Sequence, residues 1–276
     1  MALTFLAARQ TVIDKVTGAR LHPEVETVAL DAAAGRVLAE DIAADRDVPA
    51  LARSVRDGYA VRAADRRIGL AYASSAAVFG ASSAYSGGVV GDVSPVMPDT
   101  HYGVYKVANE GTARVYSLNN GIGSIGLRPF IVYGPGRDQG MTSDATKAIL
   151  AAVQGEPFKF KFGGNMLLTY APDCARAFIE SARAAAGSGD ALVLNVPGRR
   201  VGVAQLVALI EKLLPEAAGL LSWETKPISA PALLSSPALG DVIGPVANTS
   251  LEDGVGATIE HFRRAVADGV LSSSPS

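Results

Sequence analysis

The alternation of apolar and polar positions changes character near residue 68. Before it, apolar residues recur at helical spacing as far as Gly18, and short strand-like stretches follow, among them residues 24–30. After it, continuous apolar runs alternate with amphipathic stretches, which is typical of parallel strands buried on both faces and of the helices that cover them. The pattern predicts an α/β fold for the larger, carboxyl-terminal part.

This larger part is predicted to contain three buried strands and five helices. The strands are expected at residues 68–75, 125–133 and 191–196. The helices are expected at residues 102–118, 143–154, 172–186, 203–214 and 250–268. The helix at residues 143–154 is expected to start at Ser143 or Asp144 and to stop at Gly155. Pro172 suits the first turn of the next helix, and Ser250 with Asp253 forms a capping box at the start of the last one. Proline and serine interrupt residues 227–249, which we expect to be irregular.

Charge density changes at the same point as the pattern of apolar and polar positions. Residues 1–67 hold ten basic and ten acidic side chains, whereas the other 209 residues hold 15 and 17, about half that density. We interpret this as a junction near Arg67. It divides the chain into an appended segment, residues 1–66, and a main part, residues 67–276.

Composition excludes several classes of function. A net charge of −2 offers no basic excess for nucleic acid or a membrane surface. The uncharged stretch at residues 68–91 is rich in serine and glycine, so it predicts a buried strand and a loop, not a membrane span. The single Cys174 forms no internal disulfide and is expected in the core of a cytoplasmic protein. His22, His101 and His261 lack partners at ligand spacing, so we expect no metal.

The strongest chemical signal is the pair Tyr102 and Lys106, preceded by Ser75 at the end of a predicted buried strand. Residues four apart share a helix face, and an ammonium near a phenol favours the phenolate. A serine at the carboxyl end of a strand can hold a substrate oxygen beside that phenol. The arrangement suits proton transfer coupled to hydride transfer, although Y-x-x-x-K by itself also arises by chance.

Further stretches give this motif its context, namely residues 72–80, 102–110, 126–137, 170–178 and 194–198. With them, the chain from residue 68 resembles the carboxyl-terminal portion of extended short-chain dehydrogenases/reductases of the NAD-dependent epimerase/dehydratase type. The resemblance implies a partial Rossmann-like parallel sheet and NAD or NADP as cofactor. It also implies a small-molecule substrate, which would be a sugar, a nucleotide sugar or a related carbinol.

The resemblance also implies roles for individual residues. Tyr102 matches the general acid/base, Lys106 the residue that holds the nicotinamide ribose, and Ser75 the residue that orients the substrate. Phe130 and Ile131 match positions beside the nicotinamide.

Three further residues are substrate-binding candidates, namely Ala77, Arg137 and Asp138. Arg137 and Asp138 follow G-P-G and could line a substrate cleft, although loops often carry such charged pairs. Residues 164–166 stand where the family commonly has an arginine that pairs with substrate phosphates.

The family opens with a strand and a glycine-rich turn that receives the dinucleotide pyrophosphate. We find no such pattern before residue 68, so the first strands and the glycine-rich loop are predicted to be missing. Residues 121–126 spell G-x-G-x-x-G, but a predicted helix precedes them and a strand follows. Because the fingerprint needs the opposite order, we interpret these residues as a connector.

The first segment has a resemblance of its own. The stretches A-A-R-Q-T-V-I-D-K-V and S-V-R-D-G-Y-A resemble the amino terminus of the molybdopterin molybdenumtransferase (MoeA/gephyrin E-domain) family. The resemblance implies a small α+β segment. Asp57 matches an aspartate of that family's site, but it also suits a turn before Gly58, and we favour the turn.

Three functions remain open from sequence. The first is an NAD(P)-dependent epimerase/dehydratase-like enzyme. The second is an inactive chimeric remnant acting as a scaffold, whose uncovered sheet edge and apolar face the appended segment or a second copy in a homodimer could cover. The third is a fragment for molybdenum cofactor biosynthesis. We favour the first, with Tyr102, Lys106 and Ser75 as its catalytic group.

Overall fold

The structure is a computed structural model, and it describes residues 10, 14, 69–85, 89–140, 142–228 and 233–271. The strands and the Asp57 turn predicted within residues 1–67 lie outside the described residues. Gln10 and Asp14 are helical and are joined by a hydrogen bond of 2.8 Å. Residues 69–271 belong to one compact unit.

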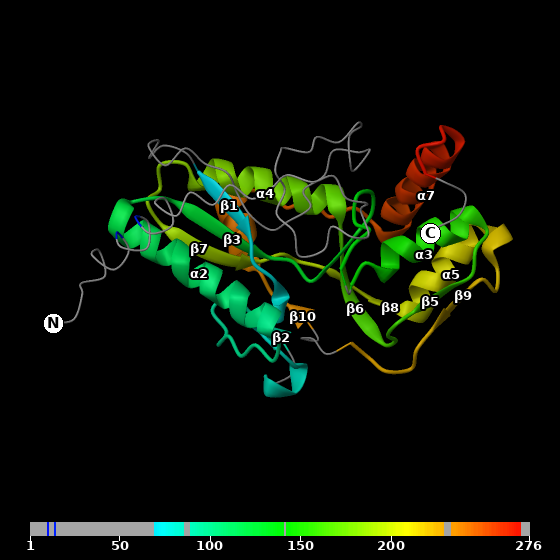
Figure 1. Cartoon of the computed structure of the whole chain (residues 1–276), viewed down its shortest axis with the longest axis horizontal. Helices are drawn as coiled ribbons and strands as arrows, with labels where there is room; N and C mark the ends of the chain where they lie inside the picture. The colour runs from blue at the N-terminus through cyan, green and yellow to red at the C-terminus, as the bar shows by residue number, and fades with distance from the viewer. Residues whose placement is uncertain are drawn as a thin grey trace. The chain divides into compact units, whose positions relative to one another are not determined.

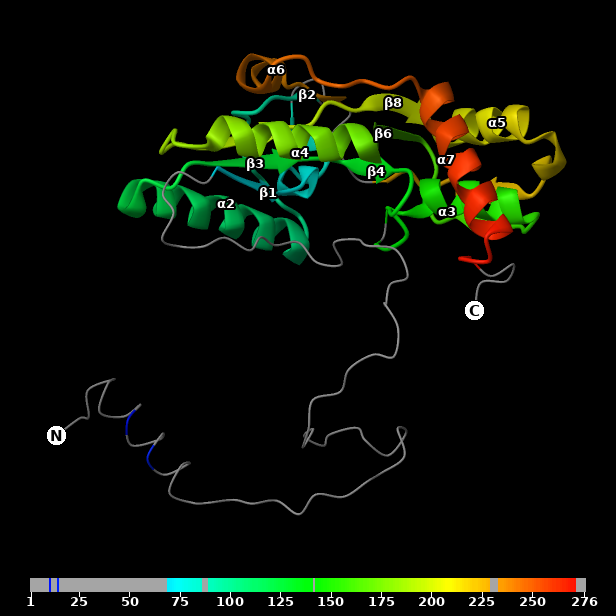
Figure 2. The same cartoon turned by 90° about the horizontal axis from the view of Figure 1, so that it is seen from above.

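A parallel sheet of three strands forms the part of the unit that carries the candidate motif. Its order is β1 (Leu70–Ala73), β3 (Ser124–Arg128) and β7 (Ala191–Asn195). Helices α2 (His101–Asn120) and α4 (Ala171–Ala185) lie on opposite sides of β1 and β3 (Figures 1 and 2). The predicted Rossmann-like α/β architecture with parallel strands is confirmed.

A second sheet continues from the first. In it β4 (Ile131–Tyr133) pairs in parallel with β6 (Asn165–Tyr170), and β6 pairs antiparallel with β8 (Arg199–Gly202). The helices packed around this sheet are α3 (Asp144–Gln154), α5 (Val203–Leu213) and α7 (Leu251–Ala267). Together they enclose the largest apolar core among the described residues, with Phe160, Met166 and Ile210 fully buried.

Two short parallel pairs complete the described strands. They are β2 (Val89–Val90) with β10 (Leu233–Leu234), and β5 (Phe158–Phe160) with β9 (Leu221–Trp223). The remaining elements are α6 (Pro237–Ile243) and the 3-10 turns η2 (Ala76–Val78), η3 (Ser82–Ala84) and η5 (Pro215–Ala217). The stretch expected to be irregular at residues 227–249 therefore contains a strand and a short helix.

The single strand predicted at residues 125–133 is wrong. It is two strands, β3 and β4, which belong to different sheets and are separated at Pro129. Proline has no N–H to donate to a ladder, so a central strand cannot continue through it. The Pro129 carbonyl instead accepts a hydrogen bond of 3.0 Å from the Ala76 N–H, which holds η2 against the end of β3.

The helices follow the predicted caps closely. Ser143 and Gly155 flank α3, a proline lies in the first turn of α4, and the Ser250 side chain accepts the Asp253 N–H at the start of α7. Gly121 ends α2 at φ 64°, and β3 follows at Ser124. A helix thus precedes the G-x-G-x-x-G stretch and β3 begins within it, so residues 121–123 connect a helix to a strand, the opposite of the order that the dinucleotide fingerprint needs. Among the described residues, no helix is both long and apolar enough to cross a membrane.

Candidate functional site

The candidate site is built where the chain leaves β1. Ser75 caps the short turn η2, and its hydroxyl oxygen accepts the Ala77 N–H at 3.2 Å. Because this contact uses the oxygen as an acceptor, the hydroxyl proton of Ser75 can be donated to a ligand. Ser75 follows the last residue of β1 by two positions, so it lies at the carboxyl end of a parallel strand, the edge where α/β sheets bind ligands.

Helix α2 begins directly against this turn. Thr100 caps it by accepting the Gly103 N–H at 3.0 Å. A Cβ atom at Gly103 would lie 2.3 Å from the carbonyl oxygen of Ala77 and 2.8 Å from the Pro98 side chain. Only a residue without a side chain allows this approach, so Gly103 lets the first turn of α2 contact η2.

Lys106 lies one turn further along α2 and is only 3% exposed. Its ammonium donates to the carbonyl oxygen of Ala73 at 2.9 Å and lies 5.3 Å from the centre of the Tyr102 ring. Tyr102 itself is 50% exposed. The helix therefore places a buried ammonium behind an accessible phenol.

The predicted cofactor contacts Phe130 and Ile131 are placed differently. Phe130 is half-buried and packs against the apolar cluster that contains Val78 and Phe79, and also against the core of the second sheet. Ile131 is fully buried in the core of the second sheet. The structure thus gathers Ser75, Ala77, Tyr102, Lys106 and Phe130 around η2, whereas Ile131 has no exposed surface.

Arg137 and Asp138 lie in the loop after β4. The Arg137 guanidinium donates to the Gln139 carbonyl oxygen at 2.6 Å and to the Thr142 hydroxyl at 3.3 Å. These bonds hold the loop itself, and Asp138 is exposed on it. The two residues therefore belong to a different segment from the group around η2.

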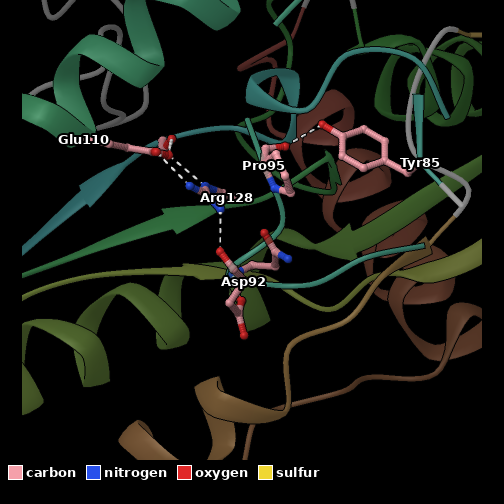
Figure 3. A network of polar contacts seen from close by, with 7 residues as sticks. Tyr85, Asp92, Pro95, Glu110 and Arg128 are labelled. Atoms are coloured by element: carbon pink, nitrogen blue, oxygen red, sulfur yellow. Dashed lines mark hydrogen bonds and ion pairs between the residues drawn. The ribbon is translucent and has the colours of Figure 1, made fainter. Parts of the chain in front are cut away.

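A buried polar network beneath the site was not predicted from sequence. Arg128 donates to both carboxylate oxygens of Glu110, each at 2.7 Å, and to the Asp92 carbonyl oxygen at 3.0 Å (Figure 3). The usable signal was a charged residue, Arg128, inside an apolar strand. A buried guanidinium requires an anionic partner, and Glu110 lies two turns beyond Tyr102 on the predicted helix.

A second polar group lies where α7 begins. The Asp173 carboxylate accepts the Thr249 N–H at 2.7 Å and its hydroxyl at 2.9 Å. Burial raises the pKa of Tyr133 and Tyr170, and the nearby Asp173 carboxylate raises both further, so the two phenols stay protonated.

Burial likewise raises the pKa of Cys174 to about 12, so the thiol stays protonated. This agrees with the buried position expected for it. Among the described residues, no group of three or more histidine, cysteine, aspartate or glutamate side chains could hold a metal ion.

Two protein families match the sequence. The NAD dependent epimerase/dehydratase family matches residues 50–196. The MoeA N-terminal region (domain I and II) matches residues 3–94. Both suspected resemblances are thereby confirmed, and the two matches share residues 50–94.

Solved structures resemble the fold. MoeE5 in complex with UDP-glucose and NAD is 27% identical, with a TM-score of 0.58, and the match covers 71% of this chain and 65% of that one. UDP-glucuronic acid 4-epimerase from Bacillus cereus in complex with NAD is 20% identical, with a TM-score of 0.58 and coverage of 71% and 61%. UDP-glucose 4-epimerase from Thermotoga maritima with UDP-glucose is 21% identical, with a TM-score of 0.61 and coverage of 71% and 63%.

The chain thus spans 61–65% of the length of these three proteins. No match was found among curated proteins.

Proposed function

The chain belongs to the NAD dependent epimerase/dehydratase family, and we propose that it acts on a sugar or nucleotide sugar with an NAD-type cofactor. The observation that carries this proposal is the contact of the buried Lys106 ammonium with Ala73, behind the accessible Tyr102 ring. The MoeE5 neighbour binds UDP-glucose and NAD, which supports the substrate and cofactor classes.

The residues around η2 fit the nicotinamide end of such a cofactor. The half-buried Phe130 ring offers an apolar surface for a flat heterocycle. Lys106 supplies an ammonium that can donate to ribose hydroxyls in addition to the Ala73 carbonyl, since it has three donors. When bound, the nicotinamide would accept a hydride from the substrate carbon and return it.

The chain's own residues would handle the proton. Tyr102 takes the substrate hydroxyl proton onto its phenolate oxygen, with the Lys106 ammonium 5.3 Å from the centre of its ring. Ser75 donates its hydroxyl proton to the substrate oxygen, because the Ala77 N–H occupies the hydroxyl as an acceptor. The same proton on Tyr102 is returned when the carbonyl is reduced again.

Cofactor binding provides the direct test. Adding NAD or NADH to the full chain should raise its melting temperature, because a ligand at one hundred times its Kd stabilises the folded state by about 2.7 kcal/mol. The measurement is calorimetry across a titration of the nicotinamide. Lys106→Met should lose most of this shift, whereas Lys161→Met, which removes an exposed lysine, should retain it. An unchanged melting temperature at saturating nicotinamide would contradict the proposal.

We also propose a homodimer formed through α2. Its exposed apolar and small residues recur at alternating steps of four and three, which is the spacing of a helix-pairing seam. The stripe consists of Val104, Ala108, Gly111, Val115 and Leu118. It lies opposite the buried residues Lys106 and Ala113, and Gly111 near its centre would let two copies approach closely about a two-fold axis.

Placing a charge in the stripe should separate the two copies. In Val115→Glu, two carboxylates would face each other near the two-fold axis, which costs several kcal/mol and raises the dimer Kd by about 100-fold or more. Sedimentation velocity across a concentration series measures this. Asn109→Glu is the matched control, since Asn109 is exposed on α2 outside the stripe. A dimer unaffected by Val115→Glu would place the interface elsewhere.

A further inference from the structure

A buried ion pair joins the middle of α2 to the end of β3. The Arg128 and Glu110 side chains are 5% and 10% exposed, and two parallel hydrogen bonds of 2.7 Å join them. The guanidinium also lies over the Phe79 ring, 4.9 Å from its centre. Figure 3 shows the guanidinium held between the Glu110 carboxylate and the backbone at Asp92. A pair with this geometry allows little movement between the two elements.

The pair extends to all three strands of the first sheet. Ser74, directly after β1, donates its hydroxyl to Glu110. Arg128 ends β3, and it donates to the backbone of Asp92, whose carboxylate accepts the N–H of Asn195 at the end of β7 at 2.6 Å. One carboxylate on α2 is therefore connected to the carboxyl ends of β1, β3 and β7.

Apolar packing does little to position α2. Of its 20 residues only Gly103, Lys106 and Ala113 are buried, and none of these is a large apolar residue. A helix normally gains its position from an apolar face, whereas the one α2 side chain packed against the apolar clusters of the described residues is the partly buried Val107. At its far end, the Ser117 hydroxyl donates to the Gly189 carbonyl oxygen at 2.6 Å. The position of this helix thus depends mainly on polar contacts.

Stability alone is a weak explanation for such a pair. Removing two charges from water is costly, and replacing a buried ion pair by apolar residues of similar volume is often neutral or stabilising. The property that apolar residues would not supply is the fixed distance and direction of the bidentate contact.

We infer that Glu110 and Arg128 are positioning residues, which set α2 against the strand ends so that Lys106 reaches Ala73 and the first turn of α2 lies against η2. Tyr102, Lys106 and Glu110 follow one another at intervals of four residues on one helix face. The carboxylate that anchors this face also holds Ser74, the neighbour of Ser75. The inference rests on the proposed function for its catalytic meaning, but the position of Lys106 can be measured without turnover.

The test is the double variant Glu110→Met/Arg128→Met in the full chain. It removes both charges and leaves no unpaired buried charge, so the melting temperature should stay near that of the parent. Acetic anhydride labelling, followed by mass spectrometry of peptides, should modify Lys106 about tenfold faster in the variant, because Lys106 is no longer held on Ala73. The exposed Lys161 provides an internal reference with an unchanged rate.

Replacement of the exposed pair Lys212–Glu252, which joins α5 to α7, by two methionines is the matched control and should leave Lys106 protected. Should the double variant not fold, Arg128→Lys keeps the charge but loses the two parallel bonds, and should give a smaller increase in labelling. Lys106 labelled as slowly in a folded variant as in the parent would overturn the inference. If the parent fails to bind nicotinamide, the proposed function is wrong, while the labelling result still decides the positioning role.

If the unmodified protein is active, steady-state kinetics provide a second measurement. The double variant should lower kcat by about 100-fold, which is the effect of moving a catalytic group by about 1 Å. KM should change less, because Ser75 and Phe130 do not lie on α2. An equal loss of stability and activity, with Lys106 still protected, would instead mean a purely structural pair.

Discussion

Replacing Tyr102 by phenylalanine should lower the turnover of a nucleotide sugar by about 100- to 10,000-fold, the range that a general acid/base contributes. The change removes one hydroxyl from a ring that is 50% exposed, so it should leave the stability of the fold almost unchanged. The Lys106 ammonium keeps its bond to Ala73, since that bond does not involve the phenol. We expect NAD binding and the melting temperature to stay close to those of the parent.

The measurement compares kcat and the calorimetric NAD titration for Tyr102→Phe with those for Tyr105→Phe. Tyr105 is 67% exposed and, as the sequence neighbour of Lys106, points about 100° away from it around the helix, so its hydroxyl should be dispensable. Full activity in Tyr102→Phe would contradict the assignment of the proton to this phenol. Loss of activity in both variants would point to a general effect of α2.

Gly103→Ala should have the second large effect, through geometry. The added methyl group would lie 2.3 Å from the Ala77 carbonyl oxygen, which is backbone and cannot rotate away. The first turn of α2 must then move away from η2, and Tyr102, which lies in that turn, moves with it. We expect a loss of about 1–3 kcal/mol in the free energy of unfolding and about 100-fold in kcat.

Urea unfolding and steady-state kinetics measure the two effects. Gly256→Ala is the matched control, because this glycine also lies inside a helix but has nothing within 4 Å of the added atom. Alanine should there stabilise the protein by about 1 kcal/mol, from helix propensity alone. A Gly103→Ala variant as active as the parent would show that the close approach of α2 to η2 does not matter for the reaction.

Local signals explain why the helices could be predicted well. Gly155 after α3, Pro172 in α4 and Ser250 before α7 act within one turn of their own helix, so their neighbours in sequence contain the required information. The relation of Tyr102 to Lys106 is of the same kind, since residues four apart share a helix face in any fold.

Pro129 shows where this reasoning failed. The run around it is apolar on both sides, and apolarity alone does not distinguish one strand from two strands in different sheets. The break follows from the missing N–H of proline, and the sheet to which each half belongs was decided by strand pairing with β1 and with β6. The same change of sheet leaves Phe130 half-buried near η2 and buries Ile131 completely.

The sequence by itself determined the family resemblance of both parts, the α/β character, most helix ends and the face shared by Tyr102 and Lys106. Only the tertiary structure decided that Gly103 contacts Ala77, that Lys106 is held by Ala73, and that Glu110 and Arg128 pair beneath them. The physical reason is the distance along the chain over which each kind of interaction acts. Propensity and periodicity act within a few residues, whereas a close backbone approach or a buried ion pair joins positions that only the packing of α2 on the strand ends brings together.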